Sequence, residues 1–173
     1  YPPSRAREKL NIVSELERIT LQEPDFVILQ NIELQCITET GLYFEAAPLA
    51  WQKLKEKLTV ELNDDFPGLF VGIGHDNPHE EGVKEDQVRF SAGVAFIDND
   101  LGINRILIPE GSYARFNYYG KPNNLGLAYH YIYGAWQDSA SVKINKNKFA
   151  FQLFDHFPSS FGAHDILIHL PII

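Results

Sequence analysis

The stretch QVRFSAGVAF, residues 87–96, decides the fold class because apolar side chains occupy every second position along it. That period of two places the apolar set on one face of an extended chain, which predicts a β-strand. A short apolar run at 69–74 and a polar loop at 75–86 precede it, so these segments predict a strand-loop-strand pair. The residues on the apolar face are Val88, Phe90, Ala92, Val94 and Phe96.

Upstream of this pair the pattern predicts a helix and, before it, another strand. Pro48 suits a first helical turn, and Trp51, Leu54 and Leu58 then share one face. Alternation over residues 32–37 predicts the strand, which follows a linker at residues 23–25. The first half therefore has the order strand, helix, strand, strand.

Downstream of the turn signal at 98–100 the same order returns. Apolar residues 106–108 open the second set and lead, after a Pro-Glu-Gly break, into an aromatic strand. The pattern predicts strands at 113–119, 149–154 and 166–170, with a helix over 125–137. We therefore expect an α+β fold of duplicated strand-helix-strand-strand modules that form a curved antiparallel sheet, with the helices on one face and a ligand cleft on the other.

Composition and charge exclude several functional classes. Fifteen basic and twenty-three acidic residues give a net charge of −8, which disfavours contact with a phosphate backbone. No apolar run reaches the roughly 20 residues that span a bilayer, so we expect no membrane partner. The single cysteine, Cys36, allows no internal disulfide, and no secretory leader opens the chain; we expect a cytoplasmic protein.

Residues 1–24 carry a separate signal. Apolar residues recur every third position from Leu10 to Ile19, which predicts a surface helix between Ser4 and Pro24. This helix could pair with a second copy of the chain or pack on its own domain, so a homodimer stays open. The chain begins with Tyr1 and contains no methionine, and we expect it to be a piece of a longer protein.

Four short motifs resemble the GyrI-like family, which includes the effector domains of Rob-type regulators and stand-alone gyrase-inhibitory proteins. They are Ile108-Pro109-Glu110-Gly111-Ser112-Tyr113-Ala114-Arg115-Phe116, Ile132-Tyr133-Gly134-Ala135-Trp136, the closing Asp165–Ile172 strand, and His75-Asp76-Asn77-Pro78 with Arg89-Phe90. In addition, Tyr1-Pro2-Pro3-Ser4 and Arg7 resemble the end of an AraC-type helix-turn-helix domain. The resemblance implies an AraC-type remnant and linker helix at 1–24 and a GyrI-like effector-binding domain at 25–173.

The resemblance also implies a ligand site. In relatives that bind cationic drugs, a glutamate of the fifth strand faces the cleft and a tyrosine follows two residues later; the matching residues here are Gln152 and Phe154. An amide offers dipoles where a carboxylate would neutralise a cation, so we expect a small, largely apolar or weakly polar ligand. The other candidate ligand-binding residues are His169, Trp136, Tyr133, Tyr113 and Phe90, with core packing as the alternative for Trp136.

We expect no metal ion, no cofactor and no catalytic residue. His75, Asp76 and His79 lie in one polar loop without a helical His pair, which favours a solvated acidic turn over a metal site. The glycines at 68, 72 and 74 lack the lysine of a phosphate-binding loop. Some GyrI-like proteins hydrolyse cyclopropane-bearing compounds with a cleft carboxylate, but Gln152 does not titrate.

The expected function is therefore the ligand-sensing domain of a bacterial AraC-family transcription regulator, which meets DNA only through a missing N-terminal helix-turn-helix domain. A stand-alone GyrI-like protein, acting as a gyrase inhibitor or as a hydrolase, is the alternative.

Overall fold

The strand order of the sheet shows that the two halves of the chain have the same topology. The computed structural model describes residues 21–58, 66, 68–76, 82–158 and 162–173. Eight antiparallel strands lie in the order β1-β6-β8-β7-β3-β4-β2-β5, which reads the same in reverse when β1 to β4 are exchanged for β5 to β8. The strands are β1 (Asp25–Leu29), β2 (Ile32–Gly41), β3 (Leu69–Gly74), β4 (Val88–Ala95), β5 (Asn104–Ile108), β6 (Gly111–Gly120), β7 (Ala150–Phe154) and β8 (His164–Pro171).

Each half begins with one more strand than the sequence pattern predicted. β1 pairs with β6 of the second half, and β5 pairs with β2 of the first half, so the two halves exchange their opening strands. The sequence pattern predicts a linker at residues 23–25 and assigns no element to residues 26–29. The period-two signal fails there because β1 is an edge strand whose outward side chains, Phe26 and Ile28, are apolar although they are largely exposed.

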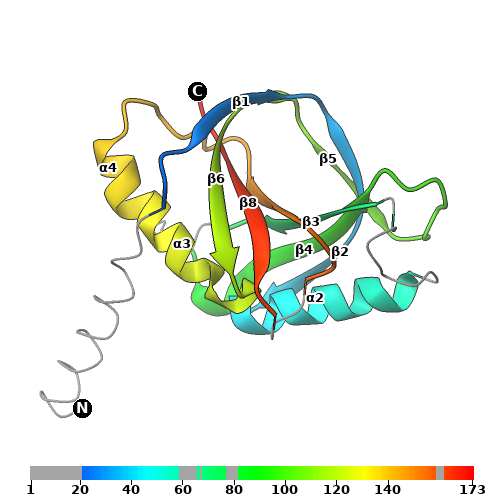
Figure 1. Cartoon of the computed structure of the whole chain (residues 1–173). Coiled ribbons are helices and arrows are strands. Elements are labelled where there is room, and N and C mark those ends of the chain that lie inside the picture. The colour runs from blue at the N-terminus through cyan, green and yellow to red at the C-terminus, as the bar shows by residue number, and fades with distance from the viewer. Residues whose placement is uncertain (1–20, 59–65, 67, 77–81, 159–161) are drawn as a thin grey trace, which may run out of the picture.

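Two helical segments lie along one side of the curled sheet (Figure 1). The first is α2 (Tyr43–Lys57), and the second runs through α3 (Leu125–Tyr131), the π-helical η3 (Ile132–Trp136) and α4 (Gln137–Ser139). Short 3₁₀ turns precede β4 and α3, at η1 (Glu85–Gln87) and η2 (Pro122–Asn124). The expected α+β fold, with duplicated modules and both helices on one face, is confirmed.

Helix α2 begins five residues before Pro48, the residue that was expected in its first turn. Leu42 precedes the helix in an extended conformation, and its carbonyl oxygen accepts the N–H groups of Glu45 and Ala46 at 2.9 and 2.8 Å. Pro48 has no N–H to donate to the carbonyl of Phe44, four residues earlier. Both residues are exposed, so that carbonyl lies where solvent can reach it.

The two faces of the sheet carry separate apolar cores. On the helix face, Phe70, Phe90, Phe116 and Phe154 pack with Leu54 of α2 and further residues of both helices. On the opposite face the sheet curls over a smaller cluster made of Leu34, Val71, Ile73, Ala95, Ile108, Tyr113 and Phe151. Both faces of the central strands are therefore buried.

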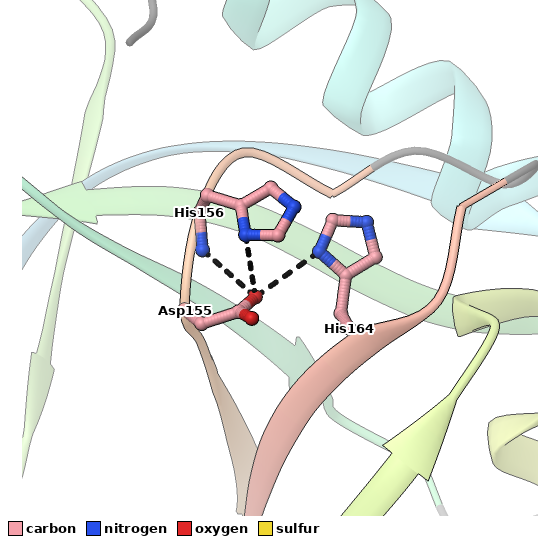
Figure 2. A group of neighbouring side chains, drawn as sticks. All are labelled: Asp155, His156 and His164. Atoms are coloured by element: carbon pink, nitrogen blue, oxygen red, sulfur yellow. Dashed lines mark hydrogen bonds and ion pairs between the residues drawn. The ribbon is translucent and has the colours of Figure 1, made fainter. Parts of the chain in front are cut away.

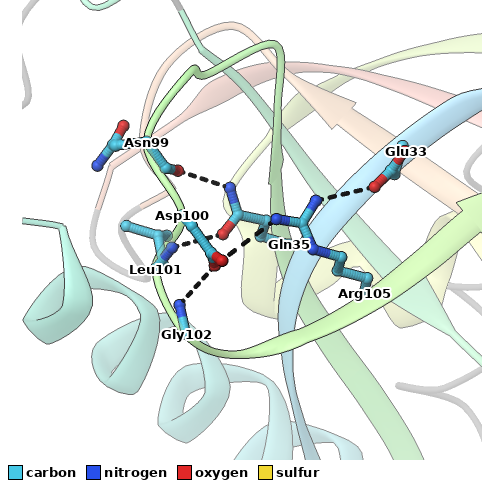
Figure 3. A network of polar contacts seen from close by, with 7 residues as sticks. All are labelled: Glu33, Gln35, Asn99, Asp100, Leu101, Gly102 and Arg105. Carbon is cyan, nitrogen blue, oxygen red and sulfur yellow. Dashed lines mark hydrogen bonds and ion pairs between the residues drawn. The ribbon is translucent and has the colours of Figure 1, made fainter.

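Gln35 of β2 fixes the connection between the two halves (Figure 3). Its side-chain nitrogen donates to the Asn99 carbonyl at 2.9 Å, and its side-chain oxygen accepts the Leu101 N–H at 2.7 Å. At the rim of the same loop, Arg105 donates to Glu33 at 2.8 Å. Gln35 is 5% exposed, so both hydrogen bonds form away from bulk water and hold the β4–β5 loop against the sheet.

The structure also bears on the expectations about membrane spans and the single cysteine. No helix in the described ranges is long and apolar enough to cross a membrane. Cys36 is fully buried, and burial raises the pKa of its thiol to about 11, so it stays protonated. The predicted N-terminal helix and AraC-type remnant, at 1–24, fall almost entirely outside the described residues, which start at Leu21.

Candidate functional site

A cleft of about 420 Å³ opens on the helix face, between α2 and the start of α3. We had expected the cleft on the opposite face, but there the curled sheet encloses the cluster around Tyr113 and Phe151. The cleft volume lies within the range of small-molecule sites. Its lining residues are Tyr43, Phe44, Ala47, Pro48, Trp51, Gln52, Lys55, Phe90, Pro122, Leu125, Phe154, Phe157 and Pro158.

Gly72 lies beneath the cleft, at the centre of the sheet. It pairs with Gln152 of β7 on one side and with Ala92 of β4 on the other. A Cβ atom at this position would lie 2.5 Å from Gln152 Oε1 and 2.9 Å from Phe90 Cζ. The missing side chain thus creates the space into which these groups converge.

Gln152 presents an unpaired acceptor in that space. Its Nε2 donates to the hydroxyl of Tyr129 on α3 at 2.5 Å, whereas its Oε1 is the one buried side-chain polar atom in the described ranges without a hydrogen-bond partner. Gln152 is completely buried and is not among the described lining residues, whereas Phe90 and Phe154 line the cleft and border the same space above Gly72 as its Oε1. Since an unsatisfied buried carbonyl is costly, a donor that reached Oε1 would be bound favourably.

Tyrosines from both helical segments gather around Tyr129, the hydrogen-bond partner of Gln152. The rings of Tyr129 and Tyr133 stack at 6.0 Å, and Tyr43 meets Phe90 edge-on at 5.6 Å. Burial raises the pKa of Tyr43, and it raises the pKa of Tyr129 well above its ordinary value of 10.0. These hydroxyls therefore stay neutral and act only as hydrogen-bonding groups.

The walls of the cleft are aromatic and nearly free of charge. Trp51 meets Phe154 and Phe157 edge-on, at 5.2 and 5.6 Å between ring centroids. None of the described lining residues carries a carboxyl group, and Lys55 is the one charged residue among them. The Lys55 ammonium lies 6.0 Å from the centroid of the Phe157 ring. Such a surface suits an aromatic guest and offers no anion to a cationic one.

The structure brings together part of the predicted ligand set. Phe90 and Phe154 line the cleft, and Gln152 lies directly beneath them on the same face of the sheet. Trp136 instead packs edge-on against Phe116 at 5.0 Å and is 4% exposed, in the core role that we considered as its alternative. Tyr133 packs against this core and stacks on Tyr129, and it is not among the described residues that line the cleft.

Tyr113 and His169 lie on the other face of the sheet, away from the cleft. The His169 ring stacks on Phe151 at 4.6 Å with an interplanar angle of 3°, and the Tyr113 hydroxyl donates to the Pro109 carbonyl at 2.7 Å. Burial lowers the pKa of His169 to about 4, so the ring is neutral at physiological pH. Strand alternation separates these two residues from Gln152, because odd and even positions point to opposite faces.

Three of the site residues that sequence reasoning missed differ in the signal that they carried. Tyr129 precedes Tyr133 by one helical turn, and this spacing could have placed both on one face. Gly72 sits inside an apolar strand, where a glycine commonly marks a close approach by another group. Nothing in the sequence distinguished Lys55 as a site residue, since it lies among three other charged residues of α2.

Hydrogen bonds occupy the polar side chains in the described part of the loop at 75–86. His75 contacts the Ser91 hydroxyl at 2.6 Å, and Asp76 accepts two hydrogen bonds from the Arg89 guanidinium at 2.8 and 3.0 Å. The Arg89 guanidinium lowers the pKa of Asp76. His79 and its acidic neighbours at 80–81 fall outside the described residues.

The duplicated sheet, the two helices on one face and the aromatic cleft between them define an α+β ligand-binding domain. A model of the GyrI-like small molecule binding domain family matches residues 22–169. The chain belongs to this family. No curated protein shows significant sequence similarity to it.

Solved structures of low sequence identity share the fold. The C-terminal domain of EcmrR superimposes with a TM-score of 0.60 at 15% identity, over 90% of this chain and 99% of that chain. In an EcmrR–DNA complex the match has a TM-score of 0.58 at 18% identity and covers 98% of this chain but 63% of that one.

Two further structures with the same fold are described differently, one as a complex with a small molecule and one as a hydrolase. SAV2435, solved with bound tetraphenylphosphonium, matches with a TM-score of 0.52 at 16% identity, over 88% of this chain and 94% of that chain. A hydrolase from Listeria innocua matches with a TM-score of 0.52 at 9% identity, over 96% and 97%. At these identities the similarity is one of fold.

Proposed function

We propose that this domain is the ligand-sensing part of a bacterial AraC-family transcription regulator. Membership of the GyrI-like family supports a small-molecule role. EcmrR supports a regulator, because its matching domain is part of a longer chain solved in a DNA complex. The AraC-type assignment rests on the resemblance of Tyr1-Pro2-Pro3-Ser4 and Arg7. With a net charge of −8, the domain leaves DNA contact to another part of the protein.

The ligand in this proposal is a neutral, aromatic, weakly polar molecule. The observation that carries the proposal is an aromatic cleft without a carboxyl group in its described lining. SAV2435 holds a lipophilic cation in a similar fold. Here Gln152 occupies the position at which cation-binding relatives have a glutamate, and Lys55 at the cleft adds a positive charge. A cation that entered would be desolvated without a counter-charge.

Gln152 would orient the guest. Its unpaired Oε1 accepts one hydrogen bond, so the favoured ligand carries a hydroxyl or an amide N–H beside its aromatic groups. Phe90 and Phe154 must part for that group to reach the amide, because both rings border the space above Gly72. A ligand that binds the parted arrangement more tightly shifts the domain toward it, by no more than its differential affinity.

Binding without chemical conversion is also part of the proposal. Hydrolysis in this cleft would need a general base, and the described lining residues include no Asp, Glu or His. The Tyr43 and Tyr129 hydroxyls stay protonated. Mass analysis of each recovered ligand after prolonged incubation tests this point, since a hydrated product would show that the domain is an enzyme.

A panel of ligand pairs that are matched in shape and differ in charge tests the proposal. Each pair has one neutral member with a hydroxyl group and one cation of similar shape, such as triphenylmethanol and methyltriphenylphosphonium. We expect neutral members to raise the melting temperature; a ligand at 100 times its Kd adds about 2.7 kcal/mol to the unfolding free energy. Gln152→Leu should weaken the neutral members that carry a donor. Stabilisation by the cations alone, or a flat response across the panel, would refute the proposal.

A further inference from the structure

Outside the cleft, three potential metal ligands meet where the β7–β8 hairpin turns. Figure 2 shows Asp155, His156 and His164 with both imidazole rings directed at one carboxylate oxygen. The two Nδ1 atoms, of His156 and His164, lie 2.9 and 3.1 Å from Asp155 Oδ1. One ligand atom from each of the three residues lies within 4.8 Å of the other two.

Backbone pairing holds this group in place. Phe154 and Ile166 are register partners at the end of the β7–β8 ladder, and the Asp155 N–H donates to the Asp165 carbonyl at 3.3 Å. Asp155 therefore lies opposite the residue that follows His164, the first residue of β8. The Asp165 N–H donates to Asp155 Oδ2 at 3.1 Å, which orients the carboxylate and leaves Oδ1 toward the histidines. The His164 side chain is 1% exposed and packs edge-on against Phe154, while His156 is 54% exposed and gives access from solvent.

Hydrogen bonding alone accounts poorly for the convergence on Oδ1. That oxygen faces both imidazole nitrogens and also accepts the His156 backbone N–H at 2.9 Å. The two rings lie only 4.2 Å apart between centroids. Three donors thus crowd one oxygen, whereas a cation would use both nitrogens and the carboxylate charge together.

We propose that Asp155, His156 and His164 form a binding site for a divalent transition-metal ion of the zinc type. Two imidazoles and one carboxylate are a donor set that Zn²⁺ accepts, with bonds of about 2.0–2.2 Å. Tetrahedral geometry at such bond lengths separates ligand atoms by about 3.4 Å. The two oxygen–nitrogen distances, 2.9 and 3.1 Å, lie within a few tenths of an ångström of that value, and all three ligand atoms lie within 4.8 Å of one another. Water takes the remaining coordination position, on the exposed side of His156.

The site lies just outside the wall of the cleft. Phe157 follows His156 directly, and its ring packs edge-on against Trp51 at 5.6 Å and Phe70 at 5.3 Å. A metal ion at Asp155 would therefore fix the turn that supplies the Phe157 and Pro158 side of the cleft. Residue spacing did not indicate this site, because Asp155 and His156 are nine and eight residues from His164 and the β7–β8 hairpin brings the three together.

Calorimetric titration of the untagged protein with Zn²⁺ and Co²⁺ tests the proposal. We expect one equivalent of each ion to bind and Co²⁺ to give the visible absorption of a nitrogen- and oxygen-ligated centre. His156→Ala removes an exposed ligand with little risk to folding, and it should weaken binding by about 100-fold or more, since even outer partners of metal ligands contribute 10- to 100-fold. Asp155→Asn, which keeps the side-chain shape, should also weaken it.

His75→Gln is the matched control. His75 follows Gly74, the last residue of β3, which pairs with Ala150 at the start of β7. Asp155 follows the end of β7, so the two residues lie at opposite ends of that strand. Metal affinity should be unchanged in this variant. The proposal is overturned if neither ion binds saturably, or if His156→Ala binds the ions as tightly as the wild type does.

Discussion

Replacing Gln152 with glutamate would place a carboxyl group beneath the cleft, among phenyl rings and beside a single donor. In the wild type the amide oxygen has no partner, and the nitrogen bonds to Tyr129. Burial raises the pKa of a carboxyl group by up to 3–5 units, and one hydrogen bond from the Tyr129 hydroxyl would recover part of this. We take the folded-state pKa of the introduced group to rise from about 4.3 to roughly 7.

The resulting loss of stability depends on pH. Below about pH 4 the introduced group is protonated in both the folded and the unfolded state, so the variant unfolds with nearly the wild-type free energy. Between about pH 4.3 and 7 the unfolded chain ionises first, and each pH unit costs about 1.4 kcal/mol. At and above pH 7 the loss reaches about 4 kcal/mol.

Urea unfolding at several pH values from about 4 to about 8 measures this loss. Gln152→Leu is the control, because it also removes the amide but introduces no titrating group; its stability relative to wild type should not change with pH. A lipophilic cation such as methyltriphenylphosphonium should restore stability to the glutamate variant and not to the leucine variant. If the glutamate variant were as stable as wild type at neutral pH, position 152 would be solvated and our description of the site would be wrong.

Three further predictions concern the scaffold. Gly72→Ala should cost about 1–3 kcal/mol of unfolding free energy by overpacking, whereas Gly74→Ala in the same strand meets no atom within 4 Å and should be nearly neutral in urea unfolding. Gln35→Leu should lower the free energy of unfolding by about 2 kcal/mol, because it removes two buried hydrogen bonds. Arg105→Ala removes only exposed ion pairs and should lower it by less than about 1 kcal/mol. Because the pKa of His169 is lowered from 6.5 to about 4, stability should fall by about 3 kcal/mol as pH drops through that window; His169→Gln should flatten this dependence in thermal unfolding.

Sequence patterns predicted the central strands and both helices because large apolar side chains recur in these segments with the period of a strand or a helix. Alternation along 87–96 reproduces β4, and the aromatic run at 113–119 lies inside β6. The patterns failed at β1, where the sheet edge leaves apolar side chains in solvent, and at the start of α2, where Pro48 imitates a first turn. These errors arise where tertiary pairing, rather than local preference, determines the structure.

The candidate site was predicted only in part for a related reason. Alternation correctly placed Gln152 and Phe154 on one face, but it could not show that this is the face covered by the helices. For the same reason Tyr113 and His169 were grouped with residues from which the sheet separates them. Tyr129 was missed because its role depends on how α3 packs over β7. A pattern within one strand or helix does not determine how two elements face each other.

The two tryptophans of the chain allow the most direct test of ligand binding in the cleft. Trp51 lines the cleft, whereas Trp136 packs against Phe116 in the core, so each indole N–H gives a separate NMR signal with its own location. During titration with a neutral aromatic alcohol that raises the melting temperature, the Trp51 indole and the Gln152 side-chain amide should shift in parallel while Trp136 stays nearly constant. Movement of the Trp136 signal alone, or saturation without any change at Trp51, would place the ligand elsewhere and contradict the account.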